Sequence, residues 1–204
     1  ATAIHSSKWL NPKPGTDTAL ALGIAQVMLE RGWYDREFVR DWTNGPLLVR
    51  ADTGRLLTHS DLTLGGSEHH YAAWDATLSR PISYDPATGY AGDRPEPALF
   101  GTYPIQTLHG AVICRPAFQL TVDHCRSYSP ARVEAITGVG REQIEAAAQM
   151  LWAARPAAYY AWSGVEMQTN ATQIARAIAQ LHMLTGSFNR PNGNVLFAAA
   201  PTAN

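Results

Sequence analysis

The apolar residues of this chain follow helical spacing near both ends and lose that spacing in the middle. Residues 17–32 are almost uniformly apolar, with leucine, isoleucine and valine set among alanines, and Gly32 ends the run. A helix that is apolar on every side is buried on every side. We therefore expect this helix to lie between a sheet and a second layer, followed by a short second helix at residues 35–41.

Helical spacing returns at residue 115 and predicts four further helices, at residues 115–124, 130–137, 142–154 and 170–185. The second of them begins at Pro130, a proline at the first helical position, and has Ser129 as its N-cap. The last helix has Asn170 as its N-cap candidate, Gln173 three residues later as in a capping box, and Gly186 after its end.

A short apolar run precedes the last helix. Residues 157–161 read Ala-Ala-Tyr-Tyr-Ala, which is typical of a buried strand of a parallel sheet. A polar loop then leads into the helix, and a strand, loop and helix in this order place ligands at the carboxyl edge of a doubly wound sheet. We predict an α/β fold, a Rossmann-like parallel sheet with flanking helices.

The middle of the chain has a different character. Residues 47–50 and 55–58 flank a turn that contains Gly54, which predicts a β-hairpin. The stretch that follows is rich in glycine and proline and has few periodic apolar residues. We predict that residues 45–111 form an irregular, β-hairpin-containing insertion on a domain that otherwise spans residues 1–204.

Composition narrows the class of protein. The 204 residues are 46% hydrophobic and only 16% charged, which indicates that another part of a larger protein covers much of the surface. A formal charge of −1 offers no basic excess for nucleic acid, and no apolar run is long enough to span a membrane. The chain begins at Ala1 without a signal peptide, so we expect a piece of a longer polypeptide, of undetermined localisation.

The candidate chemistry lies in two loops, each leading into a helix. The first reads Pro14-Gly15-Thr16-Asp17, and its carboxylate stands where backbone N–H groups have no helical partner. One carboxylate accepts both N1–H and N2–H of guanine, as it accepts an arginine fork, and adenine has no such donor pair. Alternatively, Asp17 is simply the N-cap. The second loop spans residues 163–170, and neither loop carries a GxGxxG or P-loop motif.

Three segments together resemble the catalytic subunits of the molybdenum/tungsten bis-pterin oxidoreductases, the dimethyl sulfoxide reductase family. They are residues 13–23, which contain the Pro-Gly-Thr-Asp loop, residues 163–171, and residues 184–195. The last segment is similar to the family's Leu-Thr-Gly-x-x-x-Arg-Pro-Gly-Gly stretch, with Asn192 in place of the first glycine of the final pair. The resemblance covers roughly residues 1–45 and 112–197.

The resemblance implies a cofactor and the residues that bind it. In the family, two molybdopterin guanine dinucleotides (bis-MGD) hold one Mo or W, and the Pro-Gly-Thr-Asp loop contacts the guanosine end of one of them. This carries over to Gly15, Thr16 and Asp17. The loop before the last helix lies near the pterin, which points to Ser163, Gly164 and Met167, although relatives have a polar amide at the position of Met167.

The resemblance also implies what lies outside the chain. The parent would be an oxidoreductase that transfers oxygen atoms or hydride equivalents, and this chain would be its central α/β cofactor-binding domain. The metal ligand and any iron–sulfur cluster would lie upstream, so this chain would hold no metal ligand and no catalytic residue and would be inactive alone. Its partners would be the remaining domains and an iron–sulfur electron-transfer subunit.

Two alternatives come from other classes of protein. A thiamine-diphosphate enzyme's middle domain also has apolar helices around a parallel sheet without a P-loop. A stand-alone module that senses a purine nucleotide would use the first loop alone. Cys114 and Cys125, with no CxxC spacing, indicate neither a zinc nor an iron–sulfur site.

Overall fold

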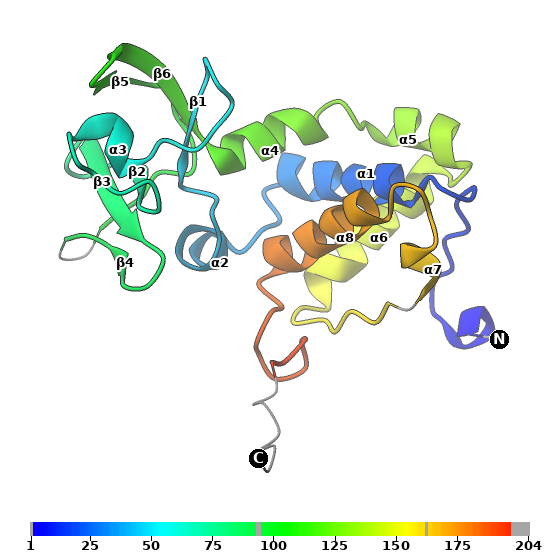
Figure 1. The fold of residues 1–204 in the computed structure, drawn as a ribbon. Helices are drawn as coiled ribbons and strands as arrows, with labels where there is room; N and C mark the ends of the chain where they lie inside the picture. Colours follow the sequence, from blue (N-terminus) through cyan, green and yellow to red (C-terminus); the bar gives the residue numbers. More distant parts are fainter. Residues whose placement is uncertain (1, 93–94, 162, 197–204) are drawn as a thin grey trace, which may run out of the picture. The chain divides into compact units, whose positions relative to one another are not determined.

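The structure is a computed structural model that describes residues 2–92, 95–161 and 163–196. The chain divides into two compact units. The first contains the residues up to 36 and those from 125 onward, and the second contains residues 37–124. The ribbon of both is drawn in Figure 1, and each unit is described by itself.

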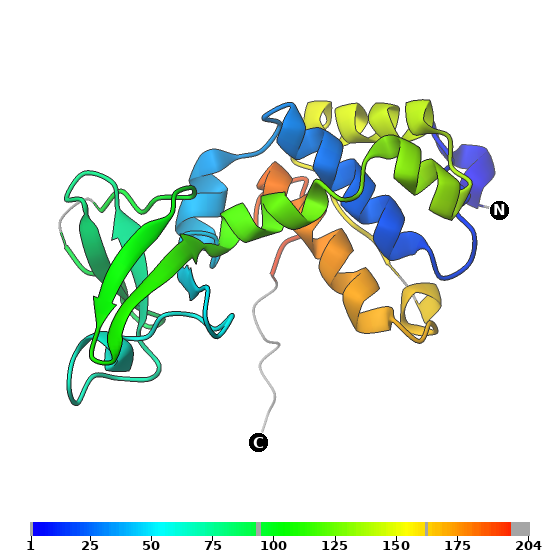
Figure 2. The same ribbon diagram turned by 90° about the horizontal axis from the view of Figure 1, so that it is seen from above.

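The first unit is built from helices packed on one another. Figure 2 shows α1 lying between α8 on one side and the α5–α6 pair on the other. The apolar residues on all sides of α1 are therefore buried against helices, and not against a sheet as we expected. The elements of this unit are η1 (Thr2–His5), α1 (Asp17–Glu30), α5 (Pro130–Thr137), α6 (Arg141–Ala153), α7 (Ser163–Glu166) and α8 (Ala171–Thr185).

Local capping signals explain where α5 begins and where α5 and α8 end. The Ser129 hydroxyl oxygen accepts a hydrogen bond from the Arg132 backbone N–H at 3.4 Å, and Gly138 ends α5 with a φ of 77°. Gly186 ends α8 in the same left-handed conformation, which glycine adopts without strain. The predicted capping box of α8 is wrong, because the Asn170 side chain makes no capping bond to the helix.

The predicted parallel sheet is not found among the described residues. Residues 157–161 are extended but form no strand, because their backbone bonds to side chains and not to a second strand. The Ala157 N–H donates to the Ser187 hydroxyl oxygen at 3.1 Å. The Asn194 amide accepts from the Tyr159 N–H at 2.6 Å and donates to the Tyr159 carbonyl at 2.8 Å. The mixed helix-and-strand class is confirmed, but the strands lie in the second unit.

The second unit contains two antiparallel sheets of three strands each. One has the order β1-β6-β5 and the other the order β2-β3-β4. Leu48 pairs with Pro116 in the first sheet, and Tyr71 pairs with Tyr84 in the second. The elements that begin or lie in this part of the chain are α2 (Arg36–Trp42), β1 (Leu48–Arg50), α3 (His59–Leu62), β2 (Tyr71–Asp75), β3 (Arg80–Asp85), β4 (Gly89–Tyr90), β5 (Tyr103–Thr107), β6 (Gly110–Pro116) and α4 (Ala117–Cys125).

This unit contains more residues, 37–124, and more regular secondary structure than the insertion that we predicted at residues 45–111. The predicted hairpin forms, since the Leu57 N–H donates to the Leu48 carbonyl at 2.8 Å and Arg50 bonds to Arg55 across the turn at 2.9 Å. However, the main partner of β1 is β6, far along the chain. The unit has its own apolar core, formed by Leu48, Leu57, Ala72, Ile105 and Cys114. The assignment of residues 1–204 to one central domain stays a prediction.

None of the helices in the described part of the chain is long and apolar enough to cross a bilayer.

Candidate functional site

The first loop closes on the carbonyl of Lys13. The Thr16 N–H and hydroxyl both donate to that oxygen, at 3.1 and 2.6 Å. Gly15 adopts a φ of 80°, a conformation that favours glycine. The Lys13 N–H in turn donates to the Thr137 carbonyl at 2.9 Å, which ties the loop to the end of α5. The loop therefore has a fixed shape, and the Thr16 hydroxyl helps to hold it.

Asp17 is the first residue of α1 and not its N-cap. Thr16 occupies the capping position, without a side-chain capping bond. The alternative in which Asp17 caps the helix is therefore wrong. Among the described residues, the Asp17 carboxylate has no hydrogen-bond or ion-pair partner, and it is only partly exposed. A carboxylate without a protein partner, at the end of a helix that favours negative charge, is available to a ligand.

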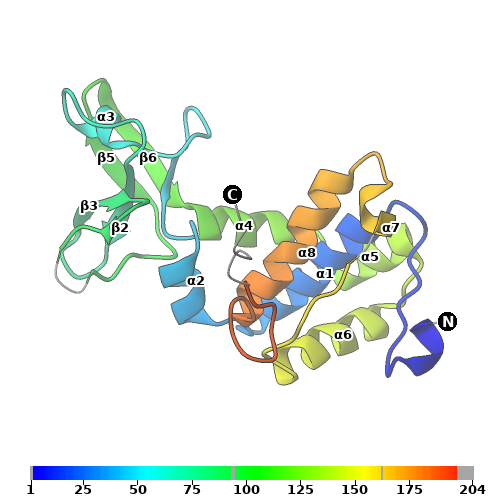
Figure 3. The same cartoon turned by 60° about the horizontal axis from the view of Figure 1, so that its bottom comes forward.

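The second loop lies against the first. A Cβ atom added to Gly15 would be 3.7 Å from the Gln168 side-chain oxygen. The Asn170 amide, which does not cap α8, donates to the Thr18 hydroxyl oxygen at 3.4 Å. Figure 3 shows α7 and the start of α8 next to the start of α1. The two helix beginnings that the sequence indicated separately thus meet at one place.

The residues predicted in the second loop are on its surface. Ser163 and Gly164 are exposed, and a Cβ atom added to Gly164 would meet no atom within 4 Å. Met167 is 81% exposed, so it contributes nothing to the core of this unit. All three side-chain positions are accessible to a ligand that covers this loop.

Tyr159 is a residue of the site that our sequence argument missed. Burial raises the pKa of its hydroxyl, and the negative charge of Asp17 raises this pKa further, which places the hydroxyl within electrostatic reach of that carboxylate. Its ring stacks at a tilt on the His182 ring, with 5.0 Å between the centroids. Its backbone is held by the Asn194 amide. The only sequence signal was an aromatic residue with a polar tip in a run expected to be buried.

The third segment of the resemblance fixes the end of α8. The Asp35 N–H donates to the Leu184 carbonyl at 2.7 Å, and the Asp35 carboxylate lies 3.6 Å from the Arg190 guanidinium. Asn192 adopts a φ of 65°, the left-handed conformation that asparagine tolerates better than most residues. The turn is therefore kept although asparagine replaces glycine.

The described residues contain no group of three or more side chains of the types that ligate metals. Cys114 and Cys125 are both free and buried, and burial raises the pKa of each thiol to about 11. They are therefore protonated near neutral pH, and a protonated thiol is neither a nucleophile nor a metal ligand.

Comparison with known proteins identifies the family. The family model described as molybdopterin oxidoreductase matches residues 1–203. The chain is 30% identical to the perchlorate reductase alpha subunit of Dechloromonas aromatica, over 96% of this chain and 24% of that subunit. It is 32% identical to the respiratory nitrate reductase alpha subunit of Haloferax mediterranei, over 91% of this chain and 20% of that subunit.

Other relatives fit the same pattern. The chain is 28% identical to the dimethylsulfide dehydrogenase alpha subunit of Rhodovulum sulfidophilum, over 94% of this chain and 21% of that subunit. It thus spans about a fifth to a quarter of the length of these relatives. Among solved structures, acetylene hydratase from Pelobacter acetylenicus shares the fold, with a TM-score of 0.52 and 20% identity over 91% of this chain and 16% of that one. These matches decide against the thiamine-diphosphate alternative, and they show that the chain belongs to the molybdopterin oxidoreductase family.

Proposed function

We propose that this chain is part of the catalytic subunit of a molybdenum or tungsten oxidoreductase, and that its first loop binds the guanosine end of one bis-MGD cofactor. The main support for this proposal is the Asp17 carboxylate, because it lacks a protein partner among the described residues and lies beside the second loop. Its two oxygens match the paired N1–H and N2–H donors of guanine.

The other residues of the two loops fit such a ligand. Gly15 lets the backbone turn without a side chain in the way, and Thr16 keeps the loop closed on Lys13. The first N–H groups of α1 have no partner within the helix and favour a negatively charged group. Ser163, Gly164 and Met167 present an open surface, which we assign to the pterin side of the cofactor.

This assignment gives the cofactor and the chain different roles. The metal and its pterins supply the oxygen-atom or hydride-equivalent chemistry when bound. This chain's residues bind and orient the cofactor, and they contribute neither a metal ligand nor a catalytic residue. Since the curated relatives are named alpha subunits, we also propose that the remaining domains of the subunit and an iron–sulfur electron-transfer subunit are the partners, with any iron–sulfur cluster outside this chain.

The test replaces Asp17 in the full-length subunit. Asp17→Ala removes both acceptors, and Asp17→Asn keeps the size of the side chain but turns one acceptor into a donor that opposes guanine. Loss of a charge-assisted pair of hydrogen bonds should weaken guanine recognition by roughly 2–4 kcal/mol. The measurement is the guanine nucleotide and the Mo or W released per purified subunit.

A matched control lies at the other end of the same helix. Glu30 is exposed and contacts Gln26 one turn earlier, away from both loops. Glu30→Gln should leave the cofactor content unchanged, whereas both Asp17 variants should lower it. Full cofactor content in Asp17→Asn would contradict the assignment of this carboxylate to guanine.

A further inference from the structure

The second unit has a cavity that is lined by residues of α3 and of the β2-β3 hairpin. Its volume is about 380 Å³, within the range of small-molecule sites. Backbone hydrogen bonds fix the position of α3 at this place. The His59 N–H donates to the His70 carbonyl at 2.8 Å, and the Thr63 N–H donates to the His59 carbonyl at 3.0 Å. On the other side, Ala72 of β2 pairs with Ser83 of β3 in the strand ladder. The cavity is therefore part of the folded unit and needs no rearrangement to form.

Five of the residues that line this cavity have polar side chains without a partner. They are His59, Thr63, Tyr71, Arg80 and Ser83. None of these side chains makes a hydrogen bond or an ion pair with a residue that the structure describes. Arg80 stands opposite Asp75 in the ladder, but the Asp75 carboxylate accepts its hydrogen bonds from backbone N–H groups. The donors of the Arg80 guanidinium therefore remain available to a ligand.

The charge of the lining favours an anion, and its apolar part favours an organic one. Arg80 is the permanently charged residue of the lining, and none of the described residues there is an aspartate or a glutamate. The other four residues of the lining are apolar, namely Leu62, Ala72, Pro81 and Ile82. Ala72 and Ile82 are buried, so they offer a wall without water to an apolar group.

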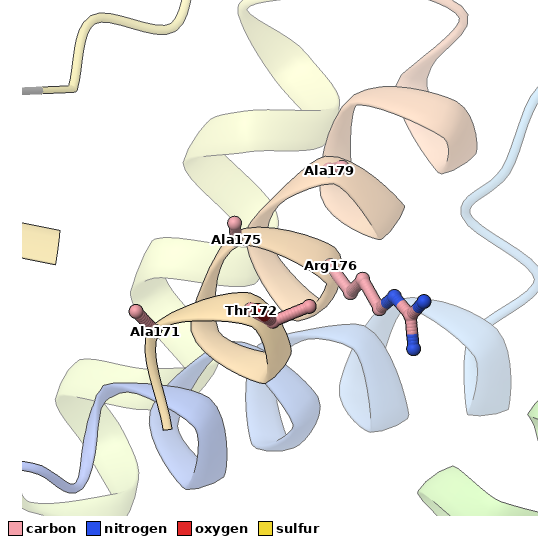
Figure 4. Close-up of a pocket in the computed structure, with 5 residues that line it drawn as sticks. All are labelled: Ala171, Thr172, Ala175, Arg176 and Ala179. Carbon is pink, nitrogen blue, oxygen red and sulfur yellow. The ribbon is translucent and has the colours of Figure 1, made fainter. Parts of the chain in front are cut away.

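A groove on α8 is larger but offers less to a ligand. Figure 4 shows this groove, whose volume is about 490 Å³. Three of the five residues that line it are alanines, which have no polar side-chain atom. Only Thr172 and Arg176 can form hydrogen bonds there through their side chains. The cavity of the second unit, by contrast, combines a guanidinium, an imidazole and three hydroxyl groups with an apolar wall.

We propose that the cavity between α3 and the β2-β3 hairpin binds a small organic anion, a carboxylate or a phosphate monoester attached to an apolar ring. Arg80 donates to the anionic group, as guanidinium groups do with carboxylates and phosphates. The His59 ring and the Ser83 hydroxyl donate to the remaining oxygens, and the apolar ring lies against Ile82. The site lies wholly in the second unit, so it is separate from the guanosine site and does not depend on the proposed function.

The test titrates the full-length subunit with four probes, and isothermal calorimetry measures their affinity. Phenyl phosphate and benzoate combine a ring with an anion, benzyl alcohol has the ring alone, and inorganic phosphate has the anion alone. We expect at least one of the first two to bind roughly tenfold or more tighter than benzyl alcohol and inorganic phosphate. The tighter of the two identifies the anionic group that the cavity prefers.

Two pairs of variants locate the binding site. Arg80→Gln should weaken binding of the tighter anion roughly tenfold, because it removes the charge and the fork of donors. His59→Gln should weaken it severalfold. Arg55→Gln and His69→Gln are the matched controls, since both residues are exposed in the same unit and do not line the cavity. Both controls should leave the affinity unchanged.

Hydrogen exchange locates the ligand without any substitution, so the test does not depend on the folding of a variant. In the wild-type subunit, a saturating concentration of the tighter anion should slow exchange at residues 59–63 and 80–83 and leave α8 unchanged. Unchanged exchange at residues 59–63 and 80–83 would overturn the proposal. So would benzyl alcohol or inorganic phosphate binding as tightly as both organic anions, or equal effects of Arg80→Gln and Arg55→Gln. None of these results depends on the Asp17 variants, which test the guanosine site separately.

Discussion

Asp75 offers a sharp test of how the second unit holds its strands together. This carboxylate is only 1% exposed. One of its oxygens accepts hydrogen bonds from the N–H groups of Thr77 and Leu78, both at 2.8 Å. The other accepts from the Glu96 N–H at 3.1 Å. Asp75 thus fixes the turn between β2 and β3 and joins it to Glu96, 21 residues further along the chain.

The hydrogen bonds of Asp75 predict different losses of stability for two substitutions of this residue. Hydrogen bonds to charged groups contribute about 1.5–3 kcal/mol each, and a buried N–H without an acceptor carries a similar penalty. In Asp75→Asn the amide oxygen can keep the bonds from Thr77 and Leu78, and only the bond from Glu96 is lost. We expect that variant to lose about 1.5–3 kcal/mol and Asp75→Ala, which loses all three bonds, to lose about 3–5 kcal/mol.

Hydrogen exchange of the amides of β2 and β3, followed by mass spectrometry as urea is added, measures the free energy of opening this unit. Asp85→Asn is the control, because the Asp85 carboxylate binds a similar turn through the Ala87 N–H but is less buried. Its effect should be clearly smaller. Equal losses in Asp75→Asn and Asp75→Ala, or losses below about 1 kcal/mol in both, would refute this reasoning.

The same carboxylate predicts a dependence on pH. The Leu78 N–H, with those of Glu96 and Thr77, holds the pKa of Asp75 below its usual range against the opposing effect of burial. A lowered folded pKa means that the stabilisation is complete above the unfolded pKa, about 3.9, and is lost as pH falls through the folded pKa. The difference in stability between the wild-type chain and Asp75→Asn should therefore shrink below about pH 4.

Three further predictions concern the first unit and the thiols. A Cβ atom on Gly193 would lie 2.0 Å from the Ser187 carbonyl oxygen, so Gly193→Ala should lower the free energy of unfolding by about 1–3 kcal/mol. A Cβ atom on Gly164 would meet no atom within 4 Å, so Gly164→Ala should change the free energy of unfolding by less than about 0.5 kcal/mol. Urea titration of both variants measures these changes. Cys114 and Cys125 should resist a thiol reagent at pH 8 until the chain is unfolded, since both are buried with pKa values raised to about 11; rapid labelling of the native chain would show that the thiols are accessible. Micromolar guanine nucleotides should barely move the melting temperature of the 204-residue chain, whereas a clear upward shift would favour a stand-alone nucleotide sensor.

Local signals explain how much of the first unit could be predicted. The ends of α5 were evident from Ser129, Pro130 and Gly138, because a cap depends on residues within one turn. The sheets of the second unit were not evident, since β1 and β6 pair over more than sixty residues. Pro81 and the scattered glycines indicated irregular structure there. In fact Pro81 stands near the start of β3, a position where a strand tolerates proline.

The contacts of the candidate site that join distant parts of the sequence could not be predicted either. The first loop and the second loop could each be identified from a few adjacent residues. Their meeting could not, because the bond between Asn170 and Thr18 joins positions 152 residues apart. The capping-box pattern even assigned the Asn170 amide to a different partner. Tyr159 escaped notice because its relation to Asp17 exists only in three dimensions.

The Asn194 side chain has a consequence for association between copies of the chain. Its amide offers one acceptor and one donor, as a peptide group does, and both are bonded to the Tyr159 backbone. One side of the extended residues 157–161 is thereby closed to the addition of a foreign strand, which is the usual first step of edge-to-edge aggregation. Asn194→Leu should open that side, and the variant should form sheet-rich aggregates sooner than the wild-type chain on prolonged incubation.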